Sequence, residues 1–312
     1  MAVQATHPIV IDAEGVRNRL SFAEAIPVIA EAMIALSTGR VRQHLRSFIG
    51  LGEGRTFAIM PAALSEEGVF GAKLVSVFHD GAGRKAHEGL VVLFDGASGA
   101  PICLADAAEI TAIRTAAASA VATDALAPNE ASSLAILGLG RQAEAHLQAL
   151  RLVRSLADIR VWGRDPQRAK AFADWHGLTA FDTVEAAVDG AQIICTVTAA
   201  TDPILQGRWV AAGTHVNVVG SSGPGQAEID SDLVARARFI VDHREHVLAH
   251  GGEFLRSGLP AEHIVAEIGE VLSGQTSGRT ARDDITVYKS LGHAAQDLAV
   301  TAWLSGQKDQ RP

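Results

Sequence analysis

The feature that most limits what this chain can fold into is an apolar run, residues 134–139, that ends in a glycine-rich turn. The turn reads Gly138-x-Gly140-x-x-Ala143, and apolar residues at helical spacing continue from it to Leu150. The first glycine allows a tight turn, the second lets the backbone approach a phosphate, and the small third residue lets helix and strand pack closely. Unpaired N–H groups at the start of the helix then face the anion. The pattern predicts a strand, turn and helix that bind the pyrophosphate of a dinucleotide.

The segment around this turn alternates short apolar runs with helical patterns. Runs rich in Val and Ile, typical of buried parallel strands, occur at residues 134–139, 159–162, 192–197, 215–219 and 239–241. Helical patterns lie between them at residues 142–154, 166–176 and 184–188. This rhythm predicts an α/β fold in which residues 128–284 form a doubly wound, Rossmann-type nucleotide domain.

Residues 1–127 lack this rhythm, and a chain of 312 residues with 48% hydrophobic content is long enough for a second domain. A helical pattern at residues 22–36 precedes strand-like runs at 45–51, 56–62 and 71–78. A hairpin follows at residues 90–104, with Asp95-Gly96 and Ser98-Gly99 as its turn residues. An alanine-rich helix at about residues 109–126 leads to the expected boundary at Pro128. Residues 285–312, with a strand-like run and a final helix, are expected to return to this first domain.

Composition excludes several classes of protein. The net charge is −8 and no Lys/Arg-rich run occurs, which argues against binding to nucleic acid. Apolar stretches are interrupted before they reach about 18 residues, and the first residues lack a basic segment followed by an apolar one, so neither a membrane span nor a signal peptide is predicted. Cys103 and Cys195 stand in apolar runs and are expected to be buried and reduced. We therefore expect a cytoplasmic protein.

Lys73 is the first candidate for chemistry. It stands in a strand-like run of apolar and small residues and shares a strand face with Val75 and Val77, so its ammonium starts from a buried surface. An unpaired buried charge costs several kcal/mol, and such a lysine usually meets an anion. The alternative is a lysine on an edge strand whose long side chain reaches water.

Arg114 is the second candidate. It is the only charged residue between Glu109 and Asp124, in a helix rich in Ala, Thr and Ser. Helices of small residues pack tightly, so a lone guanidinium there needs a carboxylate or phosphate partner. The alternative is an internal ion pair with an acid such as Asp106 or Asp124.

Other polar residues are ambiguous by themselves. Arg46 has three further arginines nearby and could be a solvated surface charge, and His87 stands in a polar segment ahead of the hairpin. His243, His246 and His250 recur on one helix face, but no fourth ligand is spaced to match them. We predict a solvated face there and no metal site.

Several segments, in order, resemble the ornithine cyclodeaminase/mu-crystallin family. These are Met60-Pro61-Ala62, Gly71-x-Lys73, the distinctive stretch Ile110-Thr111-Ala112-Ile113-Arg114-Thr115-Ala116-Ala117, the glycine turn, and Ile285–Gly292 with Gln296-Asp297. The resemblance covers nearly the whole chain and implies a homodimer whose substrate lies between the nucleotide domain and an α+β open-barrel dimerisation domain. It also implies that Arg46, Lys73 and Arg114 hold the substrate carboxylate. His87 and Ser222 complete the expected substrate-binding set.

Two departures from the cyclodeaminase branch narrow the substrate. That branch has an aspartate where this chain has Ser222, and a glutamate where it has Ala58, and the two acids meet the amines of ornithine. A serine at the first position is seen in the ketimine reductases that resemble mu-crystallin. The resemblance therefore favours imine reduction over cyclodeamination.

The residues at the end of the second strand of the nucleotide domain indicate a preference between NAD(H) and NADP(H). Gly163 stands where an acid would hold the ribose 2′-hydroxyl of NAD, and Arg164 follows it, so NADP(H) is favoured over NAD(H), although Asp165 comes next. The alternative is that Arg164 is an ordinary loop charge. The full set of expected cofactor-binding residues is Thr115, Gly138, Gly140, Arg141, Gln142, Arg164, Thr196, Val197, Thr198, Val219 and Gly292.

The sequence thus predicts an NAD(P)H-dependent oxidoreductase that reduces the C=N bond of a small cyclic ketimine carboxylate, such as pyrroline-2-carboxylate. Arg46 and Arg114 would anchor the carboxylate, and Lys73 would add charge and donate a proton. An amino-acid dehydrogenase acting on alanine or an acyclic imino acid, and ornithine cyclodeaminase itself, are the enzymatic alternatives. An alternative of another class is an NADPH-dependent binding or structural protein like mu-crystallin, although a pure binder does not need three converging cations.

Overall fold

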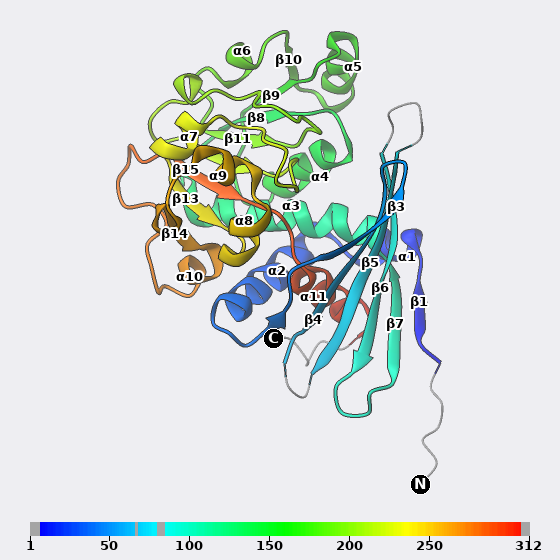
Figure 1. The fold of residues 1–312 in the computed structure, drawn as a ribbon. Helices are drawn as coiled ribbons and strands as arrows, with labels where there is room; N and C mark the ends of the chain where they lie inside the picture. Colours follow the sequence, from blue (N-terminus) through cyan, green and yellow to red (C-terminus); the bar gives the residue numbers. More distant parts are fainter. Residues whose placement is uncertain (1–6, 66–67, 80–84, 307–312) are drawn as a thin grey trace. The chain divides into compact units, whose positions relative to one another are not determined.

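The computed structural model describes residues 7–65, 68–79 and 85–306, with the backbone alone at residues 79 and 85–87. The chain divides into two compact units, Met1–Arg114 with His293–Pro312, and Thr115–Gly292 (Figure 1). Helix α3 (Ala107–Leu126) contributes residues to both. We predicted boundaries after residues 127 and 284, whereas the units divide after Arg114 and Gly292.

The first unit is built on a mixed seven-stranded sheet with the order β1-β7-β6-β5-β4-β2, in which β3 also pairs with β4. All neighbours are antiparallel except β1 and β7, and the predicted hairpin is the β6–β7 pair. The strands are β1 (Ile9–Ile11), β2 (Arg42–Gln43), β3 (Ser47–Gly52), β4 (Arg55–Ala63), β5 (Val69–His79), β6 (Lys85–Asp95) and β7 (Pro101–Asp106).

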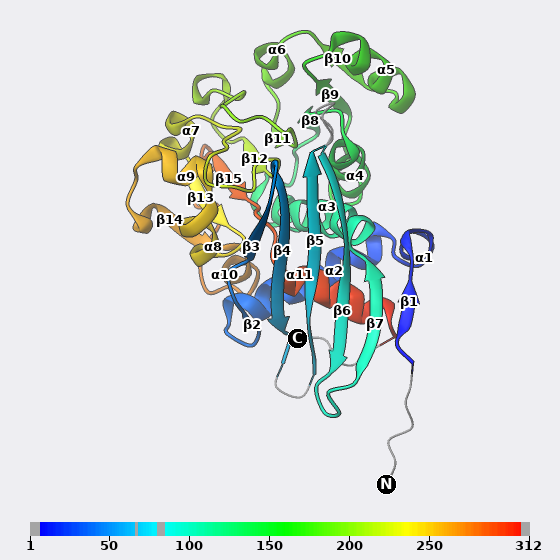
Figure 2. The same ribbon diagram turned by 45° about the vertical axis from the view of Figure 1, so that its right-hand side comes forward.

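Helices cover one face of this sheet. Helix α11 (Ala294–Leu304) lies on β4–β7 and packs against α2 (Phe22–Ser37), while the short α1 (Ala13–Arg19) lies near β7 (Figure 2). Helix α2 begins where Ser21 and Glu24 form a capping box, each side chain accepting a hydrogen bond from the other residue's backbone N–H. The period of two along the strands buries Met60, Lys73 and Val91 on the helix-covered side.

The second unit is an eight-stranded parallel sheet with the order β10-β9-β8-β11-β12-β15-β13-β14. Its strands are β8 (Ser133–Leu137), β9 (Asp158–Trp162), β10 (Thr179–Phe181), β11 (Ile193–Thr196), β12 (His215–Val218), β13 (Arg238–Val241), β14 (Ile264–Glu267) and β15 (Thr286–Lys289). Its helices are α4 (Arg141–Leu150), α5 (Pro166–His176), α6 (Val184–Val188), α7 (Ser231–Arg236), α8 (Arg244–His250), α9 (Gly252–Ser257) and α10 (Ile268–Leu272), with 3₁₀ turns at Gly207–Trp209 and Ala261–His263. The doubly wound α/β fold predicted from the sequence is confirmed.

Strand β12 illustrates how both faces of this sheet are buried. Val216 and Val218 join a core with residues of α6, α7 and α9, whereas Asn217 faces the other way and donates to Thr123 Oγ1 of α3 at 2.9 Å. The chain runs from β8 outward to β10, and then returns to β11 and runs the other way. This reversal is the topological switch point at which doubly wound folds bind nucleotides.

Our assignment of the strand-like run after residue 284 to the first domain was wrong. Strand β15 pairs with β12 and β13 inside the parallel sheet, and only the following helix α11 belongs to the first unit. The run Thr286–Lys289, TVYK, has the β-branched and aromatic residues typical of a strand, but that composition does not identify which sheet the strand joins.

Two further predictions can be compared with the described part of the chain. Cys103 and Cys195 are both buried and form no disulfide, as expected, and burial raises the pKa of Cys103 to about 11 and that of Cys195 to about 12. Among the described helices none is individually long and apolar enough to cross a membrane, although α1 and α2 together, bent by 92° at their junction, have the length and composition for one.

Candidate active site

Lys73 lies at the centre of the mixed sheet. Its strand, β5, is flanked by β4 and β6, which rules out the edge-strand alternative. The ammonium Nζ is buried and donates to Thr111 Oγ1 at 2.5 Å and to Asp297 Oδ1 at 3.0 Å. Burial lowers the pKa of Lys73 to about 8, although the charge of Asp297 acts to raise it. A lysine of this kind changes charge close to neutral pH.

Arg114 reaches the same carboxylate from helix α3. Its Nε donates to Asp297 Oδ1 at 3.2 Å, and its Nη1 donates to Gln296 Oε1 at 3.0 Å. The internal ion pair that we considered therefore exists, but with an acid that we did not name. Asp124 instead pairs with Arg154 at 2.6 Å, and Asp106 accepts from a backbone N–H in the first turn of α3.

Arg46 completes a cluster of cations in the first unit. It lies between β2 and β3, is half-buried, and is close enough that its charge helps to lower the pKa of Lys73. Lys73 and Arg114 thus share one carboxylate, that of Asp297, and Arg46 adds a third positive charge near Lys73. The excess positive charge can bind an anionic group such as a substrate carboxylate.

The two other residues predicted to contact substrate are less informative. His87 lies in β6 opposite Val77, but its side chain is outside the described residues. Ser222 belongs to the second unit, where it is half-buried in the segment that follows β12.

The glycine turn lies at the switch point of the parallel sheet. Gly138 has φ +135°, and a Cβ there would come within 2.8 Å of the carbonyl oxygen of Val197. Gly140 begins helix α4 without a side-chain cap, and a Cβ there would meet nothing within 4 Å. The space beside Gly140, at the amino-terminal end of α4, therefore fits a bound pyrophosphate.

The residues that would select between NAD and NADP follow β9. Asp165 caps helix α5, accepting from Gln167 N at 3.0 Å and Arg168 N at 3.1 Å, so its carboxylate is already engaged. Arg164 is exposed, and a Cβ at Gly163 would come within 2.2 Å of Leu139 Cδ1. An acidic side chain at position 163 would therefore require Leu139 to move.

Glu228 organises the carboxyl ends of β11 and β12, and the sequence analysis missed it. It is buried and accepts from Thr198 N at 2.6 Å, Gly220 N at 2.6 Å, and the hydroxyls of Thr196 at 2.8 Å and Thr198 at 2.7 Å. Burial raises the pKa of this carboxyl, which its hydrogen bonds oppose. Thr196 and Thr198, two of the residues predicted to bind cofactor, thus donate their hydroxyls to Glu228.

The sequence analysis also missed two further buried acids of this unit, Glu253 and Asp242. Lys289 and Glu253, both fully buried, form an ion pair at 3.0 Å, and Lys289 also donates to Ser221 O at 2.8 Å. Asp242 Oδ2 accepts from Gly292 N at 2.6 Å and fixes the turn in which Gly292 has φ +73°. A single acid in a mixed sequence gives no signal of such a role.

The prediction that His243, His246 and His250 form a solvated face was wrong. His246 is only 2% exposed, and its ring packs edge-on against that of His243. Within the described ranges no group of three potential metal ligands occurs.

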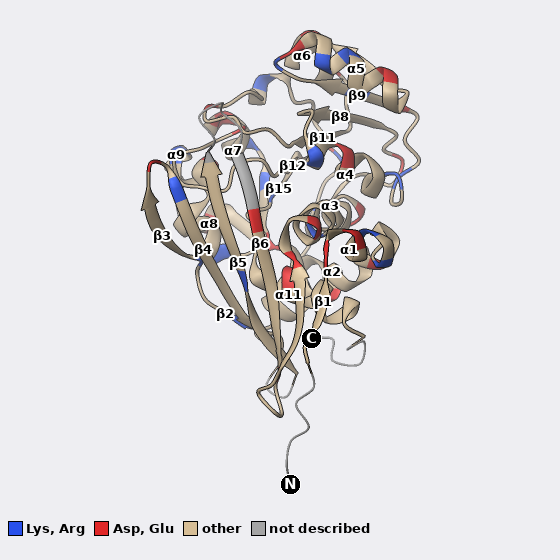
Figure 3. Cartoon of the chain, turned by 90° about the vertical axis from the view of Figure 1, so that its right-hand side faces the viewer, with Lys and Arg blue, Asp and Glu red and all other residues tan. Residues whose placement is uncertain are grey.

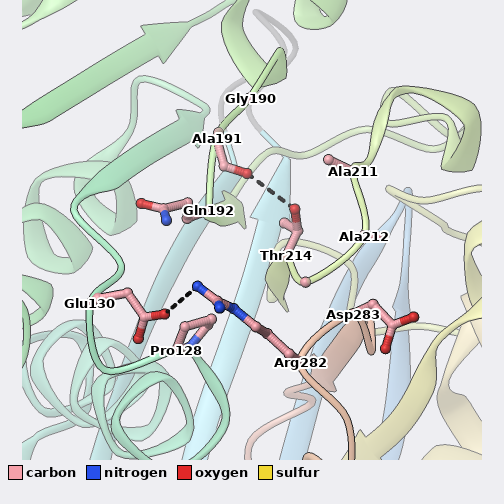
Figure 4. A pocket seen from close by; sticks show the side chains of 11 residues that line it. Pro128, Glu130, Gly190, Ala191, Gln192, Ala211, Ala212, Thr214, Arg282 and Asp283 are labelled. Atoms are coloured by element: carbon pink, nitrogen blue, oxygen red, sulfur yellow. Dashed lines mark hydrogen bonds and ion pairs between the residues drawn. The ribbon is translucent and has the colours of Figure 1, made fainter.

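A separate cavity of about 420 Å³ lies at the amino-terminal edge of the parallel sheet (Figure 4). Its lining includes Gln192, Thr214 and the exposed Arg282, which pairs with Glu130 at 3.3 Å. Because the glycine turn is at the opposite, carboxyl edge, this cavity is not the nucleotide site.

Comparison with known proteins identifies the family. A sequence profile of the ornithine cyclodeaminase/mu-crystallin family matches residues 6–307. The chain belongs to this family. Ketimine reductase mu-crystallin from Mus musculus is 37% identical over 314 residues, covering 96% of this chain and 99% of the relative.

Solved structures agree with this assignment. Δ1-pyrroline-2-carboxylate reductase from Thermococcus litoralis, in complex with NADH and L-proline, matches with TM-score 0.89 and 30% identity over 96% of each chain. An archaeal alanine dehydrogenase dimer with bound NAD matches with TM-score 0.89 and 29% identity, over 96% of this chain and 95% of that one. The protein is an NAD(P)-dependent oxidoreductase, as predicted, whereas the roles of individual site residues stay predictions.

Proposed function

We propose that this protein reduces the C=N bond of a small cyclic ketimine carboxylate, such as pyrroline-2-carboxylate. The observation that carries the proposal is the cluster in which buried Lys73 and Arg114 share the carboxylate of Asp297, with the charge of half-buried Arg46 acting on Lys73. Its excess positive charge suits a substrate with a carboxylate next to the reacting carbon. The ketimine and pyrroline-2-carboxylate reductases among its relatives support the same substrate class.

In this proposal Arg46 and Arg114 bind the substrate carboxylate and thereby orient the C=N bond. When bound, the reduced nicotinamide cofactor supplies the hydride that the imine carbon accepts. Lys73 holds a proton that it donates toward the imine nitrogen, because a protonated imine is the better acceptor. A pKa of about 8 leaves Lys73 mostly protonated at neutral pH and still able to release that proton.

A diamine substrate is disfavoured by two side chains. Ala58 is buried on β4 and Ser222 is a neutral hydroxyl, so neither supplies the carboxylate that a second ammonium group of ornithine would need. We further propose that Arg164 favours NADP(H), since Asp165 is engaged in capping α5.

A substrate panel tests this function. We expect oxidation of NADPH or NADH with pyrroline-2-carboxylate and piperideine-2-carboxylate, with smaller activity on pyruvate plus ammonia. With ornithine and NAD⁺, proline formation is expected to stay below about 1 s⁻¹, the lower end of ordinary turnover numbers. Faster activity on pyruvate plus ammonia than on either cyclic imine would favour an alanine dehydrogenase, and fast ornithine turnover would show that Ala58 and Ser222 do not matter.

We also propose that the protein forms a homodimer through the uncovered face of its mixed sheet. Phe70 is 39% exposed and stacks on Phe94 with centroids 5.3 Å apart, and Leu90 is 46% exposed on the same side. Strands β4 and β5 each carry a single Arg or Lys and no Asp or Glu along their length (Figure 3). An apolar sheet face of this kind typically marks a protein–protein interface.

Light scattering after size-exclusion chromatography tests the homodimer. We expect a mass of twice 32.6 kDa for the natural protein and a shift toward 32.6 kDa for Leu90→Glu, because a charge would be buried at the interface. Trp175→Glu is the matched control, since Trp175 is 84% exposed on α5 in the second unit. A monomeric natural protein, or a Leu90→Glu variant that stays dimeric, would contradict the assignment of this face.

A further inference from the structure

Asp297 is a charged residue in an otherwise uncharged helix, α11, whose sequence is AAQDLAVTAWL. The residue is fully buried, and its Oδ1 accepts from both Lys73 Nζ at 3.0 Å and Arg114 Nε at 3.2 Å. Its Oδ2 has no hydrogen-bond partner among the described residues. The negative charge of Asp297 is therefore balanced by two cations, and both of them contact the same oxygen, Oδ1.

Burying Asp297 costs free energy, and the two neighbouring cations provide the reason for its presence. Burying a carboxylate with one unpaired oxygen costs several kcal/mol, whereas an apolar residue at this position would pack without that cost. Two buried cations without a counter-charge would in turn repel one another and favour loss of a proton from Lys73. Asp297 supplies that counter-charge. One of its oxygens, Oδ1, accepts from both Lys73 of β5 and Arg114 of α3, and so holds the two cations together.

We propose that Asp297 is a positioning residue for imine reduction: it fixes Arg114 so that its remaining N–H groups meet the substrate carboxylate, it fixes Lys73 so that its remaining N–H faces the imine nitrogen, and it keeps Lys73 protonated. This inference rests on the proposed function of the cluster. Lys73 has three N–H donors, of which Thr111 and Asp297 accept two, so one is left for the substrate.

The charged groups that face Lys73 act in opposite directions on its pKa. Asp297 on α11 raises this pKa, while Arg114 on α3 and Arg46 from the β2–β3 connection lower it, as does burial. Thr111 on α3 contributes a neutral hydroxyl. Neutralising Asp297 leaves only influences that lower the pKa, so Lys73 should lose its proton at lower pH.

The first experiment follows the charge state of Lys73 without substrate. The sequence has only five lysines, so the Cε signal of Lys73 in [¹³C]lysine-labelled protein can be assigned with Lys73→Met and titrated by NMR. In the natural protein we expect a midpoint near pH 8. In Asp297→Asn the midpoint should fall by about 1 to 3 pH units, whereas an unmoved midpoint in the folded variant would overturn the inference.

The second experiment measures kcat/KM for pyrroline-2-carboxylate against pH. Because the reaction needs protonated Lys73, kcat/KM should fall as pH rises through the pKa of Lys73, and this alkaline limb should move to lower pH in Asp297→Asn. An equal loss at every pH would indicate a merely structural role and overturn the inference. If the natural protein reduced no imine, the proposed function would fail, while the NMR titration would still report on the Asp297–Lys73 coupling.

Two further variants separate charge from geometry. Asp297→Glu keeps the charge but moves it by one methylene, so we expect a near-natural Lys73 midpoint with kcat/KM lowered about tenfold or more at all pH values. A kcat/KM equal to that of the natural protein in Asp297→Glu would contradict the positioning role. Asp297→Glu therefore tests that role even if Asp297→Asn does not fold. Asp174→Asn is the matched control, because Asp174 pairs with Lys170 at the same 3.0 Å but on the exposed surface of α5, and it should leave both readouts unchanged.

Discussion

Replacing Lys73 or Arg114 with methionine is expected to lower kcat/KM for a cyclic ketimine carboxylate by about two to four orders of magnitude. Each variant loses one of the cations that would anchor the carboxylate, and Lys73→Met also loses the proposed proton donor. Steady-state kinetics with NADPH measure the effect, and NADPH binding followed by fluorescence should be largely unchanged.

The structure gives a reason why these variants should still fold. Asp297 Oδ1 has two cationic partners, so either single variant leaves the buried carboxylate with one of them. Methionine also fills a volume similar to that of the side chains it replaces. A variant that unfolds, while the surviving protein keeps its specific activity, would mean that the cations serve only the internal ion pairs.

Matched controls are available on the surface. Lys170, whose side chain is 74% exposed, and Arg282, at 91%, can be changed to methionine with the same loss of charge. Neither substitution should alter kcat/KM by more than about twofold, since exposed ion pairs contribute about 1 kcal/mol or less.

Local patterns explain which parts of the fold could be predicted from the sequence. The glycine turn, the Val-rich runs and the Asp-Gly hairpin are signals within short windows, and they predicted β8, α4 and the β6–β7 pair. Strand β15 was misassigned because its partners, β12 and β13, are distant in sequence and its four residues fit either sheet. Sheet membership depends on such non-local pairing, which periodicity does not contain.

The same distinction applies to the candidate site. Lys73 and Arg114 were detectable because a lone charge in an apolar or small-residue segment is unusual, which is a local observation. Their acid was not found, since Asp297 is separated from Lys73 by 224 residues in the sequence. Glu228 was missed for a related reason: its role depends on backbone N–H groups at the ends of two strands, and only the folded chain brings these together.

Arg164→Ala is expected to raise the KM for NADPH about ten- to a hundredfold while changing that for NADH much less. The lost contact with the 2′-phosphate would be a charge-assisted hydrogen bond worth about 1.5–3 kcal/mol, which corresponds to that range. NADH carries a hydroxyl at the same position and gains little from the guanidinium.

The environment of Arg164 makes this test specific. Its side chain is exposed, and Asp165 is already held by two backbone N–H groups of α5, so removing the guanidinium should disturb neither helix nor turn. Arg151→Ala is a suitable control, because Arg151 is an exposed arginine at the far end of α4 from the glycine turn. Equal effects of Arg164→Ala on the two cofactors, or a natural preference for NADH, would contradict the proposal. In that case Arg164 would be an ordinary loop charge, and a free 2′-hydroxyl would be the form of the ribose that the end of β9 accommodates.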